Sequence, residues 1–137
     1  MSITEMVNYD VKILMAFGES IRGNDKIYNW LLKNGYPELA ALSSAIRGSN
    51  EAVQWLMKNH YPHLAALDSA IDNSAKAYEW LNKNNYHLLM VFADACHNKP
   101  EAIAWLRKND LDIFIHLAGI IKKFRDSQTF DYHKLHF

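Results

Sequence analysis

Residues 36–60 read YPELAALSSAIRGSNEAVQWLMKNH, and residues 61–85 read YPHLAALDSAIDNSAKAYEWLNKNN. The two stretches are identical at 15 of 25 positions, and the same pattern recurs with drift along most of the chain. Four columns mark the period: Trp30, Trp55, Trp80 and Trp105; Leu31, Leu56, Leu81 and Leu106; Lys33, Lys58, Lys83 and Lys108; Asn34, Asn59, Asn84 and Asn109. Self-similarity at a fixed spacing of this length predicts a repeat protein.

Each unit carries two helical stripes. Leu39, Leu42 and Ile46 recur at i, i+3 and i+7, which indicates a first helix with one apolar face. Ala52, Trp55 and Leu56 form a second stripe in the same unit. We therefore expect paired helices, with alanines at the closest contacts and each Trp ring buried between units.

Residues that favour helix ends separate these stripes. Small, amide or left-handed-tolerant residues stand where each helix should stop, at Gly23, Gly35, Gly48, His60, Asn73, Asn85, Asn98 and Asp110. Asn24, Ser49 and Ser74 follow as N-cap candidates, and Pro37, Pro62 and Pro100 stand at first helical positions. The predicted helices cover about 25–34, 37–47, 50–59, 62–72, 75–84, 87–97, 100–109 and 112–125. Before them we expect an N-terminal segment that is either one long helix or two helices broken near Asp10.

These elements predict an all-α fold, a right-handed α-α superhelix (solenoid) of 25-residue two-helix repeats with about nine helices. Residues 1–125 would form one helical-repeat domain, with a degenerate N-terminal cap (1–22) and repeats at about 23–48, 49–73, 74–98 and 99–125. Residues 126–137 match no repeat. We expect this tail to dock as a cap over the end of the array, since terminal units need covering; a linear motif or a disordered segment are the alternatives.

Composition favours a soluble, cytoplasmic protein. Half of the 137 residues are apolar, which suffices for a core, and 15 basic residues balance 15 acidic ones. Net charge zero provides no global attraction to nucleic acid or an acidic membrane. Cys96 is the only cysteine, so no intrachain disulfide is possible, and no apolar run approaches the roughly 18 residues of a membrane span. We also expect no signal peptide.

The short paired helices and polar turns of residues 11–125 resemble the α-solenoid class that includes HEAT, tetratricopeptide and ankyrin arrays. The likeness is one of architecture, because the Trp-Leu-x-Lys-Asn core matches none of those families' motifs. The resemblance implies a curved surface that engages proteins or, less often, nucleic acid.

The candidate partner-binding residues lie on the first helix of each unit. They are Arg22, Arg47, Asp68, Asp72, Asp94, His97 and Lys122, which we expect to be exposed in neighbouring rows. Their sign changes along the array from basic to acidic to basic. This pattern suggests a non-enzymatic protein-protein interaction scaffold, either a monomer or a weak end-to-end oligomer. An ordinary solvated face is the alternative.

Two other functions compete with this one. The Lys column could bind nucleic acid phosphates, although each Lys also complements the dipole at the end of its helix. An enzyme of the helical-repeat glycosylase type would need exposed Trp rings and an acidic residue in one cleft.

Metal and cofactor chemistry have little support. His60 and His63, and His133 and His136, have spacings that zinc can use, but no thiolate or further motif accompanies them. We predict no metal and no cofactor. Asp94 and His97 could form an acid–base pair, but we expect an ordinary i, i+3 contact on the surface. Cys96 stands in an Ile column and is expected to be a buried hydrophobe.

Overall fold

Residues 6–135 of the computed structural model form nine α-helices and no strand, and side chains are described for residues 6–128. A 3-10 turn, η2 (Met6–Asn8), is followed by α1 (Val11–Ile21), α2 (Asp25–Lys33), α3 (Pro37–Ile46), α4 (Asn50–Lys58), α5 (Pro62–Ile71), α6 (Ala75–Lys83), α7 (His87–Cys96), α8 (Pro100–Lys108) and α9 (Asp112–Leu135). The predicted all-α repeat fold is therefore confirmed. Residues 1–5 of the predicted N-terminal cap lie outside the described part of the chain.

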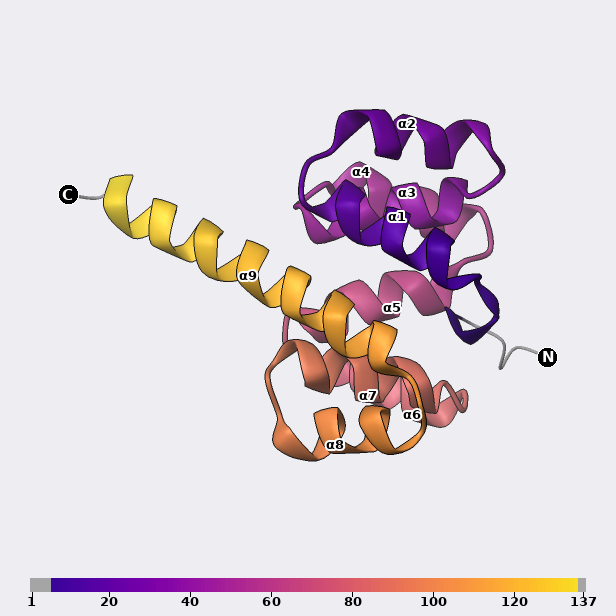
Figure 1. Ribbon diagram of the computed structural model, residues 1–137, viewed down its shortest axis with the longest axis vertical. Helices are drawn as coiled ribbons and strands as arrows, with labels where there is room; N and C mark the ends of the chain where they lie inside the picture. The colour runs from indigo at the N-terminus through magenta and orange to yellow at the C-terminus, as the bar shows by residue number, and fades with distance from the viewer. Residues whose placement is uncertain (1–5, 136–137) are drawn as a thin grey trace.

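The helices form two layers (Figure 1). The odd-numbered helices α1, α3, α5, α7 and α9 pack side by side in chain order, and we call them the inner helices. The outer helices α2, α4, α6 and α8 each pack on the two inner helices that flank them in sequence. The core lies between the layers, where Leu31, Leu56, Leu81 and Leu106 have no exposed surface.

The inner layer closes on itself, because α9 packs against α1 as well as α7. Gly18 lies at this α1–α9 seam, where a Cβ atom would stand 2.9 Å from both Ile120 Cδ1 and Leu117 Cδ2. The five inner helices of the described chain therefore form a ring. End-to-end stacking of copies would need free faces on α1 and α9, and these two faces cover each other.

Filling the seam should weaken the ring. We expect Gly18→Leu to lower the free energy of unfolding by about 1–3 kcal/mol, the usual cost of overpacking a closed core. Gly119→Ala on α9 is the control, since no atom outside the local helix backbone lies within 4 Å of the added Cβ. That change should raise stability by about 0.5–1 kcal/mol through better helix propensity. Urea denaturation measures both, and equal effects would show that the seam is not tightly packed.

The predicted helix ends are confirmed. All eight residues expected to adopt the left-handed conformation have φ between 58° and 108°. Asn24, Ser49 and Ser74 cap α2, α4 and α6 by accepting hydrogen bonds from backbone N–H groups at 3.1–3.2 Å. The Asn column also has a role: Asn34, Asn59, Asn84 and Asn109 each donate a side-chain hydrogen bond of 2.8 Å to the Trp carbonyl four residues earlier.

The expectation that the Trp rings are buried between units is wrong. Trp30 and Trp55 are 44% and 36% exposed, and Trp80 and Trp105 are half-buried. On an outer helix, Trp and the Leu that follows it are about 100° apart. Because the Leu faces the inner layer, the Trp lies at the edge of the helix and reaches the surface.

Residues 126–135 continue α9 as helix rather than forming a separate tail. In Figure 1 these last turns project away from the other helices, toward the C-terminus. The first turns of α9 therefore close the ring, and the later turns extend beyond it.

Candidate functional site

The predicted partner-binding residues gather mainly at one end of the ring. Arg22, Arg47, Asp72 and His97 are the C-cap residues of α1, α3, α5 and α7, and Lys122 has the same register in α9. Four of them, Arg47, Asp72, His97 and Lys122, line a hollow of about 630 Å³. Phe124, Arg125 and Asp126 of α9 border the same hollow.

Two of these residues hold the ring together. The Arg47 guanidinium donates a hydrogen bond of 2.7 Å to the Ile21 carbonyl and lies 5.0 Å from the Phe124 ring centroid. The His97 Nε2 atom is 2.7 Å from the Ile71 carbonyl oxygen. Each side chain thus makes a polar contact with a backbone carbonyl in the last turn of a neighbouring inner helix, where no partner within the helix is available. Their role in partner binding stays a prediction, but their role in packing is direct.

Opposite charges are matched within the hollow. Arg125 pairs with Asp72, and Lys122 Nζ lies 2.8 Å from Asp126 Oδ2. Arg22, at the edge of the ring, pairs with Glu19 at 3.4 Å. Such exposed pairs contribute about 0–1 kcal/mol each. A partner at this face would have to replace them rather than meet uncompensated charges.

Asp68 is not on the surface, contrary to expectation. Only 7% of the residue is exposed, and burial, followed by the nearby Asp72 carboxylate, raises the pKa of Asp68 to about 6. Ser43, one repeat earlier, is fully buried, and its hydroxyl is without a hydrogen-bond partner among the described residues. The predicted strip of seven charged residues is therefore interrupted in its middle.

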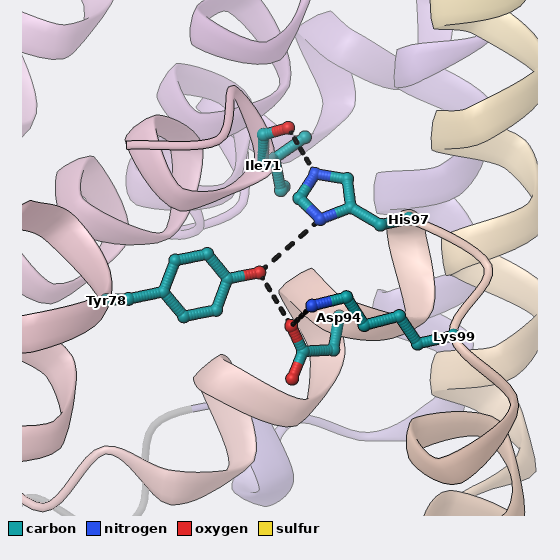
Figure 2. A network of polar contacts seen from close by, with 5 residues as sticks. All are labelled: Ile71, Tyr78, Asp94, His97 and Lys99. Atoms are coloured by element: carbon teal, nitrogen blue, oxygen red, sulfur yellow. Dashed lines mark hydrogen bonds and ion pairs between the residues drawn. The ribbon is translucent and has the colours of Figure 1, made fainter. Parts of the chain in front are cut away.

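Asp94 and His97 interact through a tyrosine (Figure 2). Tyr78 donates a hydrogen bond of 2.9 Å to Asp94 Oδ1, and its hydroxyl lies 3.4 Å from His97 Nδ1. Lys99 Nζ is 3.3 Å from the same Asp94 oxygen. Burial and the Asp94 hydrogen bond raise the pKa of Tyr78, which keeps the phenol protonated as a donor. The network joins α6 to α7 and the start of α8.

The other titratable candidates occupy structural positions. Cys96 is 3% exposed, as expected, and burial raises the pKa of its thiol, which disfavours the reactive thiolate. His63 stacks on Tyr86 with ring centroids 5.1 Å apart, and burial lowers its pKa. Among residues with described side chains, no three His, Cys, Asp or Glu are placed to share a metal ion. The second histidine pair, His133 and His136, lies outside the described side chains.

An aromatic surface on the outer layer was missed by the sequence reasoning. Trp30, Trp55 and Trp80 stack on Tyr36, Tyr61 and Tyr86 respectively, with centroids 5.7–6.2 Å apart and ring planes within 13°. Trp105 instead meets His87 edge-on. The available signal was the Tyr that follows three of the four Trp residues at an interval of six. A stacked Tyr holds the Trp side chain against the edge of the outer helix while leaving part of the indole exposed.

Grooves run beside these Trp rings. A groove of about 470 Å³ is lined by residues of α2, α3 and α4, among them Tyr28, Leu32, Glu51 and Trp55. A second groove, of about 420 Å³, lies beside α8 and contains Asp94, Lys99, Glu101 and Trp105. These volumes suit side chains or a small ligand.

No protein-family model, curated protein or solved structure matches the chain. In the described part of the chain, each helix is either too short or too polar to cross a membrane.

Proposed function

We propose that the protein is a non-enzymatic protein-protein interaction module whose outer helices receive the partner. The observation that carries this proposal is the apolar surface left uncovered on α2 and α4. Trp30 and Leu32 are each 44% exposed, Trp55 is 36% exposed and Met57 is 58% exposed. Of these residues, Leu32 and Trp55 line one groove between the two helices. Contiguous exposed apolar surface is characteristic of an interaction site. Trp in particular contributes strongly to binding energy at protein interfaces.

The charged residues around the hollow at the C-terminal ends of the inner helices contribute less to this proposal. Arg47 and His97 already bind backbone carbonyls, and Asp72 and Lys122 are already paired. These residues can set the orientation of a partner that also reaches the hollow. The apolar outer face supplies the larger gain from burial, at about 25 cal/mol per Å².

A glycosylase function would also use exposed Trp rings beside an acid. The charged residue that lines the α2–α4 groove is Glu51. Its carboxylate would repel a nucleic acid backbone rather than bind it. The groove therefore favours a polypeptide over a nucleic acid.

Selection from a displayed library of random peptides tests the proposal. Peptides enriched on the wild-type protein should bind the double variant Leu32→Glu/Met57→Glu at least about tenfold more weakly, a loss of about 1.4 kcal/mol. The control is Asn82→Glu/Arg107→Glu, which changes the same repeat position on α6 and α8 and should retain binding. Failure to enrich any peptide, or equal binding to both variants, would contradict docking on the outer face of α2 and α4.

A further inference from the structure

The grooves alternate in chemistry with a period of two units. The α2–α4 groove combines Tyr28, Ser44, Glu51 and Trp55. The residues 50 positions later are Tyr78, Asp94, Glu101 and Trp105. The last three line the groove beside α8, and Tyr78 donates a hydrogen bond to Asp94. The unit between them has Val53, Ser69, Lys76 and Trp80 at the same positions. An aromatic pair with a carboxylate thus occurs in every second unit, whereas Trp occurs in each.

The alternation is not required for the stability of the outer helices. Glu51 and Glu101 lie in the first turns of α4 and α8, where a negative charge complements the helix dipole. Lys26 and Lys76 occupy the same position in α2 and α6. Because those helices form with a cation at this position, helix stability alone does not explain the glutamates.

The α8 groove already contains a cation. Lys99 Nζ lies 3.3 Å from Asp94 Oδ1, inside the groove that Trp105 and Glu101 also line. In the α2–α4 groove the equivalent residues are Ser49 and Ser44, so that internal ion pair is missing. Glu51 makes no ion pair with any residue whose side chain is described, and it is exposed. The groove keeps the aromatic walls and the acid but has no cation of its own.

We propose that the groove between α2 and α4 binds an arginine side chain of the partner polypeptide. The guanidinium would lie against the exposed Trp55 ring and pair with the Glu51 carboxylate, one helical turn away on the same face of α4. A planar guanidinium suits both contacts, because it stacks on aromatic rings and forms two parallel hydrogen bonds to a carboxylate. Its aliphatic stem would cover Leu32 and Ala52, which also line the groove. The inference rests on the proposed interaction function and names what the outer face recognises.

The four indole N–H signals in a ¹H–¹⁵N NMR spectrum report this binding ring by ring, after assignment with single Trp→Phe variants. Titration with N-acetyl-arginine methylamide should shift the Trp55 signal and leave Trp80 unchanged, because Lys76 stands in place of Glu51. The neutral, nearly isosteric N-acetyl-citrulline methylamide should produce no comparable shift. Equal shifts of Trp55 and Trp80, or equal shifts with citrulline, would overturn the proposal.

Two variants sharpen the test. Glu51→Gln, at an exposed position, should weaken the Trp55 response about tenfold, in line with loss of a charge-assisted pair. Lys99→Ser copies Ser49 into the α8 groove and should make Trp105 respond to arginine, since the internal cation is removed. An unchanged Trp55 response in Glu51→Gln would refute the carboxylate contact. A silent Trp105 in Lys99→Ser would refute the claim that Lys99 occupies an equivalent site.

The outcomes separate this inference from the proposed function. Displayed peptides that bind the outer face but lack arginine would retain the interaction function and reject arginine recognition. A selective arginine response at Trp55 without any enriched peptide would support the groove chemistry and remove the wider docking surface.

Discussion

Replacing Phe92 by alanine should lower the free energy of unfolding by about 3–5 kcal/mol, the usual cost of truncating a buried aromatic residue. Phe92 lies on α7 with no exposed surface, and its ring meets that of Phe114 on α9 edge-on, with centroids 5.5 Å apart. The substitution opens a cavity in the contact that joins α9 to the ring. Urea denaturation followed by circular dichroism measures the loss, and a change below about 1 kcal/mol would contradict the packing described.

The matched comparison is Trp30→Ala, which removes a larger side chain from the surface. Trp30 is 44% exposed and stacks on Tyr36, so its loss should cost less than about 2 kcal/mol. If this substitution were the more destabilising of the two, the Trp residues would belong to the core after all.

Replacing Asp68 by asparagine should stabilise the protein at neutral pH and remove part of its pH dependence. Asp68 has a pKa of about 6 in the folded chain, above the ordinary value of 3.8, because burial disfavours the carboxylate. The folded state therefore binds more protons than the unfolded state between these values, and stability falls as pH rises from about 4 to about 6. Above pH 6 the penalty is constant at about 3 kcal/mol, from 1.36 kcal/mol per pKa unit.

Asp68→Asn avoids this penalty because the amide carries no charge, so the gain should appear at pH 7.5 and disappear near pH 4. Denaturation curves at several pH values measure it. Asp72→Asn, one turn later at an exposed position, breaks the pair with Arg125 and also removes the carboxylate that adds to the raised pKa of Asp68. These two effects oppose each other, so stability should change by less than about 1 kcal/mol. A wild-type slope that persists in Asp68→Asn would show that another group causes the pH dependence.

The helices and their ends could be predicted because the signals are local. Asn73 and Asn98 have positive φ, and Ser49 and Ser74 cap the next helices, as their residue types indicate. Each of these interactions spans only a few residues of one unit. Because the same residue types recur every 25 residues, each helix boundary is supported by the equivalent position in the other units.

The candidate site was harder to predict because its contacts are not local. Arg47 binds a backbone carbonyl 26 residues earlier in the chain, and His97 contacts the equivalent carbonyl two units later. The polar side chains of these residues suggested a surface role, whereas in the structure they join neighbouring inner helices. Trp30 and Leu31 are both apolar, and hydrophobic pattern alone does not decide which of two adjacent residues faces the inner layer. Closure of the ring joins α1 to α9 at the two ends of the array, and no pattern within one unit indicates it. Gly18, which leaves room for Leu117 and Ile120 at this seam, was not singled out from the sequence.

The α1–α9 contact determines how such a protein can change during evolution. An open helical array can gain or lose a unit at either end, because the contacts between the remaining units are unchanged. Here one more pair of helices would separate α1 from α9, and one pair fewer would leave them unable to meet without greater curvature. Duplication or deletion of a 25-residue block is thus penalised at a distant junction. Diversification is left to point substitutions, such as those that distinguish alternate grooves.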